Sequence, residues 1–245
     1  MTLEEIREKI FNHFDERDVY CYIDGLMWRP EDEDGDFLES DFYDYEIFLH
    51  SEETLFYDAG CTKWVIAYKD IPDWVVKVPF CGTYIYDNED EEGYYDKFIG
   101  ANNLKNNWNY CERELEIYEE AVKKDMDFFF TETHYLGQYW DMPVYISKKV
   151  DDFYTKKGVH STEKKCEECN NIVQEAESRS ENWDKDYLLS SFYITRMLDC
   201  GYSYEQIVNI ILFCQENLIG DFHSGNFGWD KEDKLRILDF SSYNR

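Results

Sequence analysis

Apolar residues between positions 54 and 150 occur in short runs rich in aromatic and β-branched side chains, which is the pattern of β-strands. Polar segments separate the runs and predict turns between the strands. We expect five strands, at 54–57, 64–68, 74–78, 128–135 and 143–150.

Apolar residues at helical spacing precede these strands and dominate the end of the chain. A helix is expected over residues 3–16, where Thr2 and Glu5 have the spacing of a capping box, and another from about 107 to 124. Three more helices are expected after residue 150, at 162–179, 187–200 and 204–218. Strands followed by a helical region predict the α+β class.

The two patterns divide the chain into three regions. Residues 1–53 hold the first helix and a Tyr-rich acidic segment, residues 54–150 hold the expected strands, and residues 151–245 are mostly helical. The chain has 245 residues, of which 43% are hydrophobic and 18% aromatic, so it has enough apolar material for a packed core.

A group of polar residues near the C-terminus has the spacing of a catalytic site. Residues 220–226 read Gly-Asp-Phe-His-Ser-Gly-Asn, and Asp239 follows thirteen positions after that Asn. Residues 227–238 have the pattern of a short hairpin, which would return Asp239 to the side of Asn226. Phosphoryl transfer requires one carboxylate near the attacking hydroxyl, and an Asn and a second carboxylate at Mg²⁺. Asp221, Asn226 and Asp239 fit these roles.

The loop form D-x-H-x-x-N, made here by Asp221, His223 and Asn226, resembles that of the protein-kinase-like superfamily, especially its aminoglycoside and choline kinase branch. The resemblance implies a two-lobed fold, in which an antiparallel-sheet lobe precedes a reduced and mostly helical lobe. It also implies that Asp221 is the catalytic carboxylate, and that Asn226 and Asp239 hold Mg²⁺ against bound ATP.

Two positions depart from the family pattern. Ile219 stands where a His usually precedes the catalytic Asp by two, which weakens the expected support of the loop. Ser241 replaces the Gly of D-F-G, which argues against the conformational switching that this motif permits. Neither departure removes a group expected to contact ATP.

Each loop residue also has a plainer structural interpretation. Asp221 could turn the chain, His223 could be a satisfied structural histidine, and Asn226 could begin an ordinary turn. Several matches in the required order and in the required secondary-structure context favour the kinase-like interpretation instead.

The resemblance also implies a buried Lys on a strand and a Glu on the helix that follows. Val-Lys-Val at 76–78 resembles the strand that carries this Lys, so Lys77 is expected to bind the α- and β-phosphates. Glu114 is our choice for its partner, with Glu112 and Glu116 as alternatives on the same helix. The plainer interpretation makes Lys77 an edge-strand residue with its ammonium group in water.

The other expected nucleotide contacts are less distinctive. Only Gly60 stands where protein kinases have three glycines, so their glycine-rich fingerprint is not matched. Thr62 and Lys63 are expected to donate to phosphates from the same loop. Ile146 lies on the strand that would meet the adenine edge, and the lysines at 148–149 add positive charge nearby.

Acidic residues strongly outnumber basic ones. The chain has 54 Asp and Glu against 25 Lys and Arg, a formal net charge of −29 and a pI near 4.4. Such a surface repels nucleic acid, so direct nucleic-acid binding is not expected, and the phosphoryl acceptor is expected to be basic or neutral. Three acidic runs, at 31–36, 41–46 and 87–92, are expected to be solvated loops or strand edges.

The eight cysteines are scattered without a disulfide framework, which indicates reduced thiols. Cys166 and Cys169 have the spacing of half a zinc site, but no second pair follows at the required distance, so zinc is not expected. The chain has no apolar run of membrane-spanning length, and its N-terminus does not resemble a signal peptide. We therefore expect a cytoplasmic protein that does not bind membranes.

The main functional hypothesis is an ATP- and Mg²⁺-dependent phosphotransferase whose acceptor is unknown. Only six residues follow Asp239, so the peptide platform of a regulated protein kinase is not expected. One alternative is a pseudokinase that acts through its surface. The other is an acidic interaction protein or inhibitor that imitates nucleic acid and binds a basic protein partner.

Overall fold

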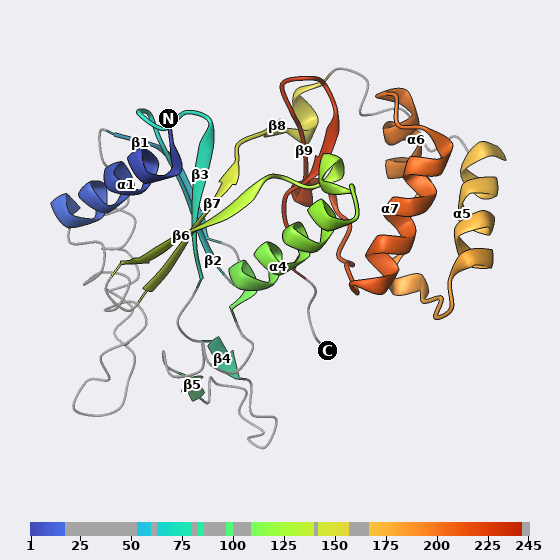
Figure 1. The fold of residues 1–245 in the computed structure, drawn as a ribbon, viewed down its shortest axis with the longest axis horizontal. Coiled ribbons are helices and arrows are strands. Elements are labelled where there is room, and N and C mark those ends of the chain that lie inside the picture. Colours follow the sequence, from blue (N-terminus) through green and yellow to red (C-terminus); the bar gives the residue numbers. More distant parts are fainter. Residues whose placement is uncertain are drawn as a thin grey trace, which may run out of the picture. The chain divides into compact units, whose positions relative to one another are not determined.

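The chain forms two compact units. The computed structural model describes residues 1–17, 53–59, 63–79, 83–85, 97–99, 109–139, 142–156 and 167–241 (Figure 1). The first unit comprises Met1–Glu112 and His134–Ser147, and the second comprises Arg113–Thr133 and Lys148–Arg245. Residues 113–133 thus belong with the helical end of the chain, although the sequence pattern grouped them with the strands.

A five-stranded sheet forms the first unit, with the strand order β1-β2-β3-β7-β6. Its strands are β1 (Thr54–Ala59), β2 (Lys63–Tyr68), β3 (Trp74–Pro79), β6 (Thr133–Tyr139) and β7 (Met142–Lys148). Both β1 with β2 and β2 with β3 pair in antiparallel register, which confirms the expected antiparallel sheet. The structure adds a separate antiparallel ribbon of β4 (Thr83–Ile85) and β5 (Lys97–Ile99).

The expected fourth strand is wrong in its first half. Asp127–Phe129 form a short 3₁₀ helix, η2, and β6 begins only at Thr133. Phe129 and Phe130 are buried in the core of the second unit. Their aromatic side chains therefore pack among helices, and the run does not extend the sheet of the first unit.

Helix α1 (Leu3–Arg17) packs against the sheet of the first unit (Figure 1). Its fully buried residues follow helical spacing and share one cluster with sheet side chains: Ile6, Ile10 and Phe14. The expected capping box is present, because Glu5 N–H donates to Thr2 Oγ1 and Thr2 N–H donates to Glu5 Oε2. The first helix is thus part of the core of this unit.

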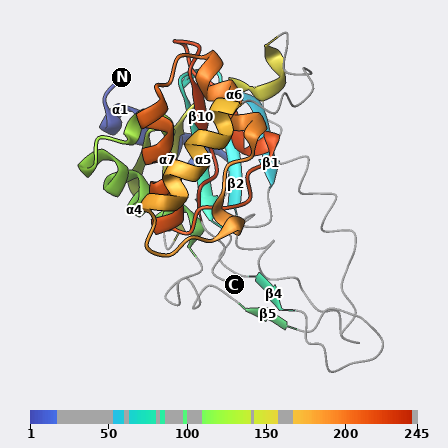
Figure 2. The ribbon, with the colours of Figure 1, turned by 90° about the vertical axis from the view of Figure 1, so that its right-hand side faces the viewer.

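The second unit combines helices with a small antiparallel sheet, so the α+β class is confirmed. Its last three helices are α5 (Glu167–Arg179), α6 (Ser191–Asp199) and α7 (Tyr204–Glu216). Helices α5 and α7 lie side by side and both contact α6 (Figure 2). The sheet has the order β10-β9-β8, formed by β8 (Asp151–Asp152), β9 (Phe227–Trp229) and β10 (Leu235–Ile237). Helix α4 (Tyr110–Lys123) belongs to this unit from Arg113 onward.

Helices α4, α6 and α7 end in the same way. Each is followed by a residue of positive φ and then by a buried residue whose N–H reaches back to a carbonyl in the last turn of the helix, which is the Schellman motif. The residues of positive φ are Asp125 at 55°, Gly201 at 87° and Leu218 at 55°. The residues that follow them all enter the core of the second unit: Met126, Tyr202 and Ile219.

Cysteine chemistry and membrane topology can be compared with the described residues. The described cysteines are free thiols: Cys111, Cys169, Cys200 and Cys214. Cys166, the other half of the half-site considered for zinc, lies outside the described residues, as do the three acidic runs. In the described part of the chain, no helix has the length and apolar character needed to cross a membrane.

The expected hairpin near the C-terminus is formed by β9 and β10. Its turn is closed by Asp230 N–H, which donates to the Lys234 carbonyl at 3.0 Å. Gly228, in the middle of β9, packs tightly against the chain around β8. A Cβ at Gly228 would lie 2.4 Å from Val150 Cγ2 and 2.7 Å from the Asp151 carbonyl oxygen. Only glycine therefore allows the two strands to approach this closely.

Replacing Gly228 by alanine is expected to destabilise the second unit by about 1–3 kcal/mol, because the backbone at Asp151 must shift to admit the methyl group. Thermal unfolding should show a melting temperature lower by several degrees, at about 2–4 °C for each kcal/mol. Glu232→Ala, at an exposed position of the same hairpin turn, is the control and should melt within about a degree of the natural protein. Equal melting of both variants would contradict the close packing of β8 on β9.

Candidate functional site

The loop that follows α7 begins from a buried anchor. Ile219, which stands where the kinase-like loop pattern has a His, is fully buried and donates its N–H to the Cys214 carbonyl at 2.9 Å. It lies in the same cluster as Phe240, the residue after Asp239. An apolar side chain thus occupies this place in the core, and the start of the loop is held by packing.

Asp221 has a backbone conformation that is rare for a residue other than glycine. Its φ is 58°, in the left-handed region, which Asp tolerates better than most residues. Its carbonyl accepts hydrogen bonds from His223 N–H at 3.0 Å and from Asn226 Nδ2 at 2.9 Å. Its side chain remains 53% exposed. The loop therefore presents the Asp221 carboxylate outward from a fixed backbone.

Asn226 is the best-anchored residue of the candidate site, and it is only 8% exposed. Its N–H donates to the His223 carbonyl, and its own carbonyl accepts from Leu238 N–H, both at 2.9 Å. The second bond places Asp239 beside Asn226, as the hairpin pattern predicts. Loop and hairpin therefore meet at one residue.

The side chain of Asn226 can be oriented from its partner. The Asp221 carbonyl only accepts hydrogen bonds, so the atom that faces it must be Nδ2. Within the part of the chain that the structure describes, no donor lies within hydrogen-bond distance of the other terminal atom, Oδ1. An amide oxygen without a donor is uncommon on a residue this buried, and it has the chemistry of a cation ligand. This oxygen fits the role expected for Asn226 at Mg²⁺.

Asp239 is fixed by the residues around it. Ser241 Oγ donates to Asp239 Oδ1 at 3.0 Å. Phe240 is fully buried, with its ring 4.9 Å from that of Phe130. The carbonyl of Ile237 accepts from Thr131 N–H at 3.1 Å. The metal-binding residue proposed from the sequence thus lies between anchored neighbours.

His223 is the other exposed polar residue of the loop, and Tyr154 contacts the loop from a 3₁₀ helix at Phe153–Thr155. His223 Nδ1 accepts from Gly225 N–H at 3.1 Å, so a neutral ring carries its proton on Nε2. That Nε2 lies 3.7 Å from Asp221 Oδ2. Tyr154, which no sequence motif pointed to, donates its hydroxyl to Ser224 Oγ at 2.5 Å. The Nε2 atom of His223 and the carboxylate of Asp221 therefore face each other on the exposed surface of the loop.

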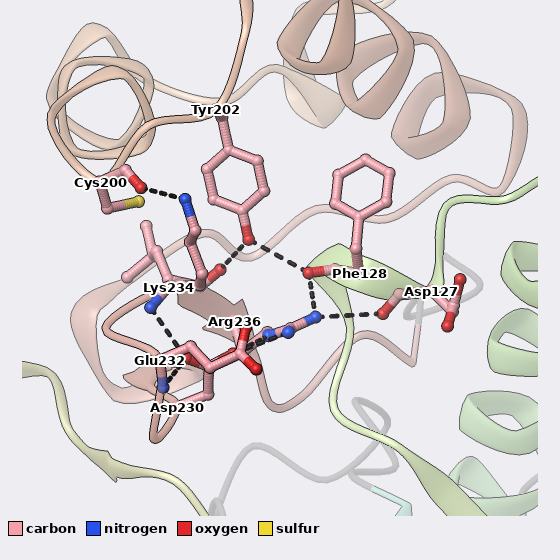
Figure 3. Close-up of polar contacts among 9 residues, drawn as sticks. Asp127, Phe128, Cys200, Tyr202, Asp230, Glu232, Lys234 and Arg236 are labelled. Carbon is pink, nitrogen blue, oxygen red and sulfur yellow. Dashed lines mark hydrogen bonds and ion pairs between the residues drawn. The ribbon is translucent and has the colours of Figure 1, made fainter.

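The turn of the β9–β10 hairpin is held by Asp230 (Figure 3). Its Oδ1 accepts from the N–H groups of Glu232 at 2.9 Å and Lys234 at 2.8 Å. Its Oδ2 accepts from Nε and Nη2 of Arg236, each at 2.7 Å. One carboxylate thus links the turn to β10.

Tyr202 and Arg236 attach the hairpin to other elements of the second unit (Figure 3). The Tyr202 hydroxyl lies 3.1 Å from the Phe128 carbonyl and 2.7 Å from the Leu235 carbonyl, so its one proton is shared between two acceptors. Arg236 also donates to the Phe128 carbonyl. Burial raises the pKa of Tyr202, which keeps the hydroxyl protonated as a donor. Asn226 and Asp239 flank a hairpin that is bonded to the turn after α6 and to η2.

Lys77 and Glu114 are both buried. Lys77, on β3, is 4% exposed and belongs to a strand with neighbours on both sides, so the edge-strand interpretation is wrong. Glu114, on α4, is fully buried, whereas Glu112 and Glu116 are exposed. A buried charge requires a partner, and both residues have one. Because Lys77 belongs to the first unit and Glu114 to the second, their pairing stays a prediction.

The other expected nucleotide contacts lie in the first unit. Gly60 and Thr62 are outside the described residues, and Lys63 is 4% exposed at the start of β2. Ile146 is fully buried in the core that α1 covers, so its side chain does not face a ligand. A contact between its backbone and adenine stays a prediction.

Among the described residues of the second unit, two clefts can be outlined, and neither is lined by Asp221, Asn226 or Asp239. One, of about 290 Å³, includes the lysines at 148–149 with four acidic residues, and the other, of about 500 Å³, lies beside the hairpin turn. Among the described residues, no group of three or more His, Cys, Asp or Glu side chains could hold a metal ion. Mg²⁺ bound with a nucleotide needs only one or two protein ligands besides phosphate oxygens, which Asn226 and Asp239 can supply.

Comparisons with protein-family models, with curated proteins and with solved structures gave no match.

The Asp230 carboxylate makes the stability of the hairpin depend on pH. Burial acts to raise its pKa, but hydrogen bonds from Lys234 N–H, Arg236 and Glu232 N–H outweigh burial and leave the pKa lowered. A lowered pKa stabilises the folded state above the unfolded pKa of about 3.9, and this contribution is lost as the pH falls through the folded value.

Asp230→Asn is therefore expected to lower the free energy of unfolding by about 1–3 kcal/mol at pH 7, since charge-assisted hydrogen bonds are lost. The difference from the natural protein should shrink as the pH falls below the unfolded pKa of about 3.9 and toward the lowered folded pKa, at which the natural carboxylate also becomes protonated. Urea unfolding between pH 7 and 3 measures this, with Glu232→Gln in the same turn as control. A difference that stays constant with pH would contradict the ionised network.

Proposed function

We propose that this protein is an ATP- and Mg²⁺-dependent phosphotransferase of the two-lobed kinase-like type, with an acceptor hydroxyl that is still to be identified. The observation that carries the proposal is the side chain of Asn226, a residue only 8% exposed, whose Nδ2 holds the Asp221 carbonyl while Oδ1 has no donor among the described residues. An amide oxygen that no protein donor satisfies is uncommon on a residue this buried, which supports a ligand role for Oδ1.

Asn226 and Asp239 are the proposed ligands of Mg²⁺. The bond between Leu238 N–H and the Asn226 carbonyl keeps the two residues together, so neither depends on a mobile segment to meet the other. When bound with ATP, the ion would neutralise charge on the phosphates. Both protein groups are oxygen donors, the ligand type that Mg²⁺ prefers.

Asp221 is the proposed catalytic carboxylate. The acceptor hydroxyl oxygen would form a bond to the γ-phosphorus of ATP while the bond to the β–γ bridging oxygen breaks and ADP leaves. The hydroxyl proton would pass to the Asp221 carboxylate, which is exposed and faces outward from the loop. His223 Nε2, at 3.7 Å, would help to orient that carboxylate.

Lys77 and Glu114 have the proposed roles of phosphate ligand and its partner. Supporting this assignment, Lys77 is nearly buried in the sheet, and among the three candidate glutamates Glu114 alone is buried. Burial of an ammonium and of a carboxylate is costly unless each is paired. The presence of both groups in the interior therefore supports a functional role for Lys77 and Glu114.

The residue to alter first is Asp221, and its left-handed backbone decides the substitution. Asn adopts this conformation readily, so Asp221→Asn should fold normally, whereas alanine would add backbone strain. Asp125→Asn is the matched control, because Asp125 has a φ of 55° and lies outside the candidate site.

With radiolabelled ATP, Mg²⁺ and water as the acceptor, the natural protein should release phosphate slowly, and Asp221→Asn should lower that rate by about 100-fold or more. Asp125→Asn should retain the natural rate, and all three proteins should bind ATP equally. An unchanged rate in Asp221→Asn would contradict the catalytic role. ATP binding without turnover in the natural protein would favour the pseudokinase, and no ATP binding would favour the acidic interaction protein.

A further inference from the structure

Ser241 carries a contact that glycine at this position could not make. Its hydroxyl donates to Asp239 Oδ1 at 3.0 Å, and both residues are partly buried. Hydrogen bonds to an ionised carboxylate are among the stronger polar contacts in proteins. The departure from the D-F-G pattern therefore adds a side chain directed at the carboxylate expected to bind metal.

The backbone at Ser241 does not require glycine. The described non-glycine residues with positive φ are Asp125, Leu218, Asp221 and Asp233, and Ser241 is not among them. A side chain at this position therefore adds no left-handed strain. What the serine contributes is the hydroxyl itself.

Because the neighbours of Asp239 are held in place, the side-chain torsions are the main conformational freedom that this residue retains. On one side, Leu238 N–H is bonded to the Asn226 carbonyl at 2.9 Å. On the other side, Phe240 is fully buried against Phe130. With the backbone held at both ends, the orientation of the carboxylate depends on rotation about its side-chain bonds, which a hydrogen bond to one oxygen restricts.

We propose that Ser241 is a positioning residue that holds the Asp239 carboxylate in the orientation that binds Mg²⁺ together with ATP. This inference rests on the proposed function. Groups that hydrogen-bond to a metal ligand orient it, and their removal lowers metal affinity by about 10–100-fold. A carboxylate has lone pairs for about four contacts, so a bond from Ser241 is compatible with a cation on the same group.

The test is calorimetric titration of ATP into the protein at a series of Mg²⁺ concentrations, for the natural protein and three variants. Ser241→Ala removes the hydroxyl, Ser241→Thr keeps one, and Asp239→Asn removes the charge of the metal ligand. The Mg²⁺ concentration for half-maximal ATP binding should rise at least about tenfold in Ser241→Ala and stay within about threefold in Ser241→Thr. Asp239→Asn should abolish the Mg²⁺ dependence.

The outcomes separate this inference from the proposed function. If the natural protein binds ATP with a Mg²⁺ dependence that Asp239→Asn abolishes, but Ser241→Ala needs no more Mg²⁺ than the natural protein, the role of Ser241 is refuted while the nucleotide site stands. If the natural protein does not bind ATP with Mg²⁺, both are refuted. A lower melting temperature in Ser241→Ala with an unchanged Mg²⁺ requirement would also refute positioning, because it would show a role in stability alone.

Discussion

The candidate site depends on the hydrogen bonds of a single residue, Asn226. Its N–H and Nδ2 hold the loop that carries Asp221, and its carbonyl receives Leu238 N–H from the segment that carries Asp239. These bonds bring together residues that lie 18 positions apart in the sequence, from 221 to 239. Among the described residues no donor reaches Oδ1, so this atom of Asn226 is available to a ligand. The same residue thus organises the loop and takes part in its proposed chemistry.

The hydrophobic core of the second unit holds the loop and the hairpin in place. Three helices end in Schellman motifs, and the residue after each turn is buried: Met126, Tyr202 and Ile219. The last of these starts the loop, and Tyr202 is hydrogen-bonded to the hairpin that leads to Asp239. Apolar burial therefore sets where the polar loop begins and ends, while the exposed Asp221 and His223 contribute little to packing.

Parts of this structure follow directly from local sequence, and others do not. The capping box of Thr2 and Glu5, the hairpin at 227–238 and the meeting of Asn226 with Asp239 were predictable, because each depends on residues near one another in the chain or on a known loop pattern. The start of β6 was not predictable from local sequence. Phe129 and Phe130 have side chains typical of strands, but they are buried in the core of the second unit. Which of two hydrophobic cores buries a side chain depends on tertiary packing, and local propensity does not predict it.

The contacts of Ser241 and Tyr154 were also not predicted from the sequence. A serine near a carboxylate in sequence has many possible partners, and only the backbone path decides that its hydroxyl reaches Asp239. Tyr154 lies 70 positions from Ser224, and nothing in either segment links them. Burial of Glu114 was equally undetermined, because Glu112 and Glu116 occur on the same helix, and only the packing of that helix separates them.

The central claim is that Asn226 and Asp239 hold Mg²⁺ with ATP, and thermal unfolding with and without these ligands tests it most directly. At about a hundred times its dissociation constant, Mg²⁺-ATP should stabilise the natural protein by ~2.7 kcal/mol, a rise of several degrees in melting temperature. Asp239→Asn should melt normally without ligand and lose the Mg²⁺-dependent rise. An equal rise in both proteins, or none in the natural protein, would contradict the account.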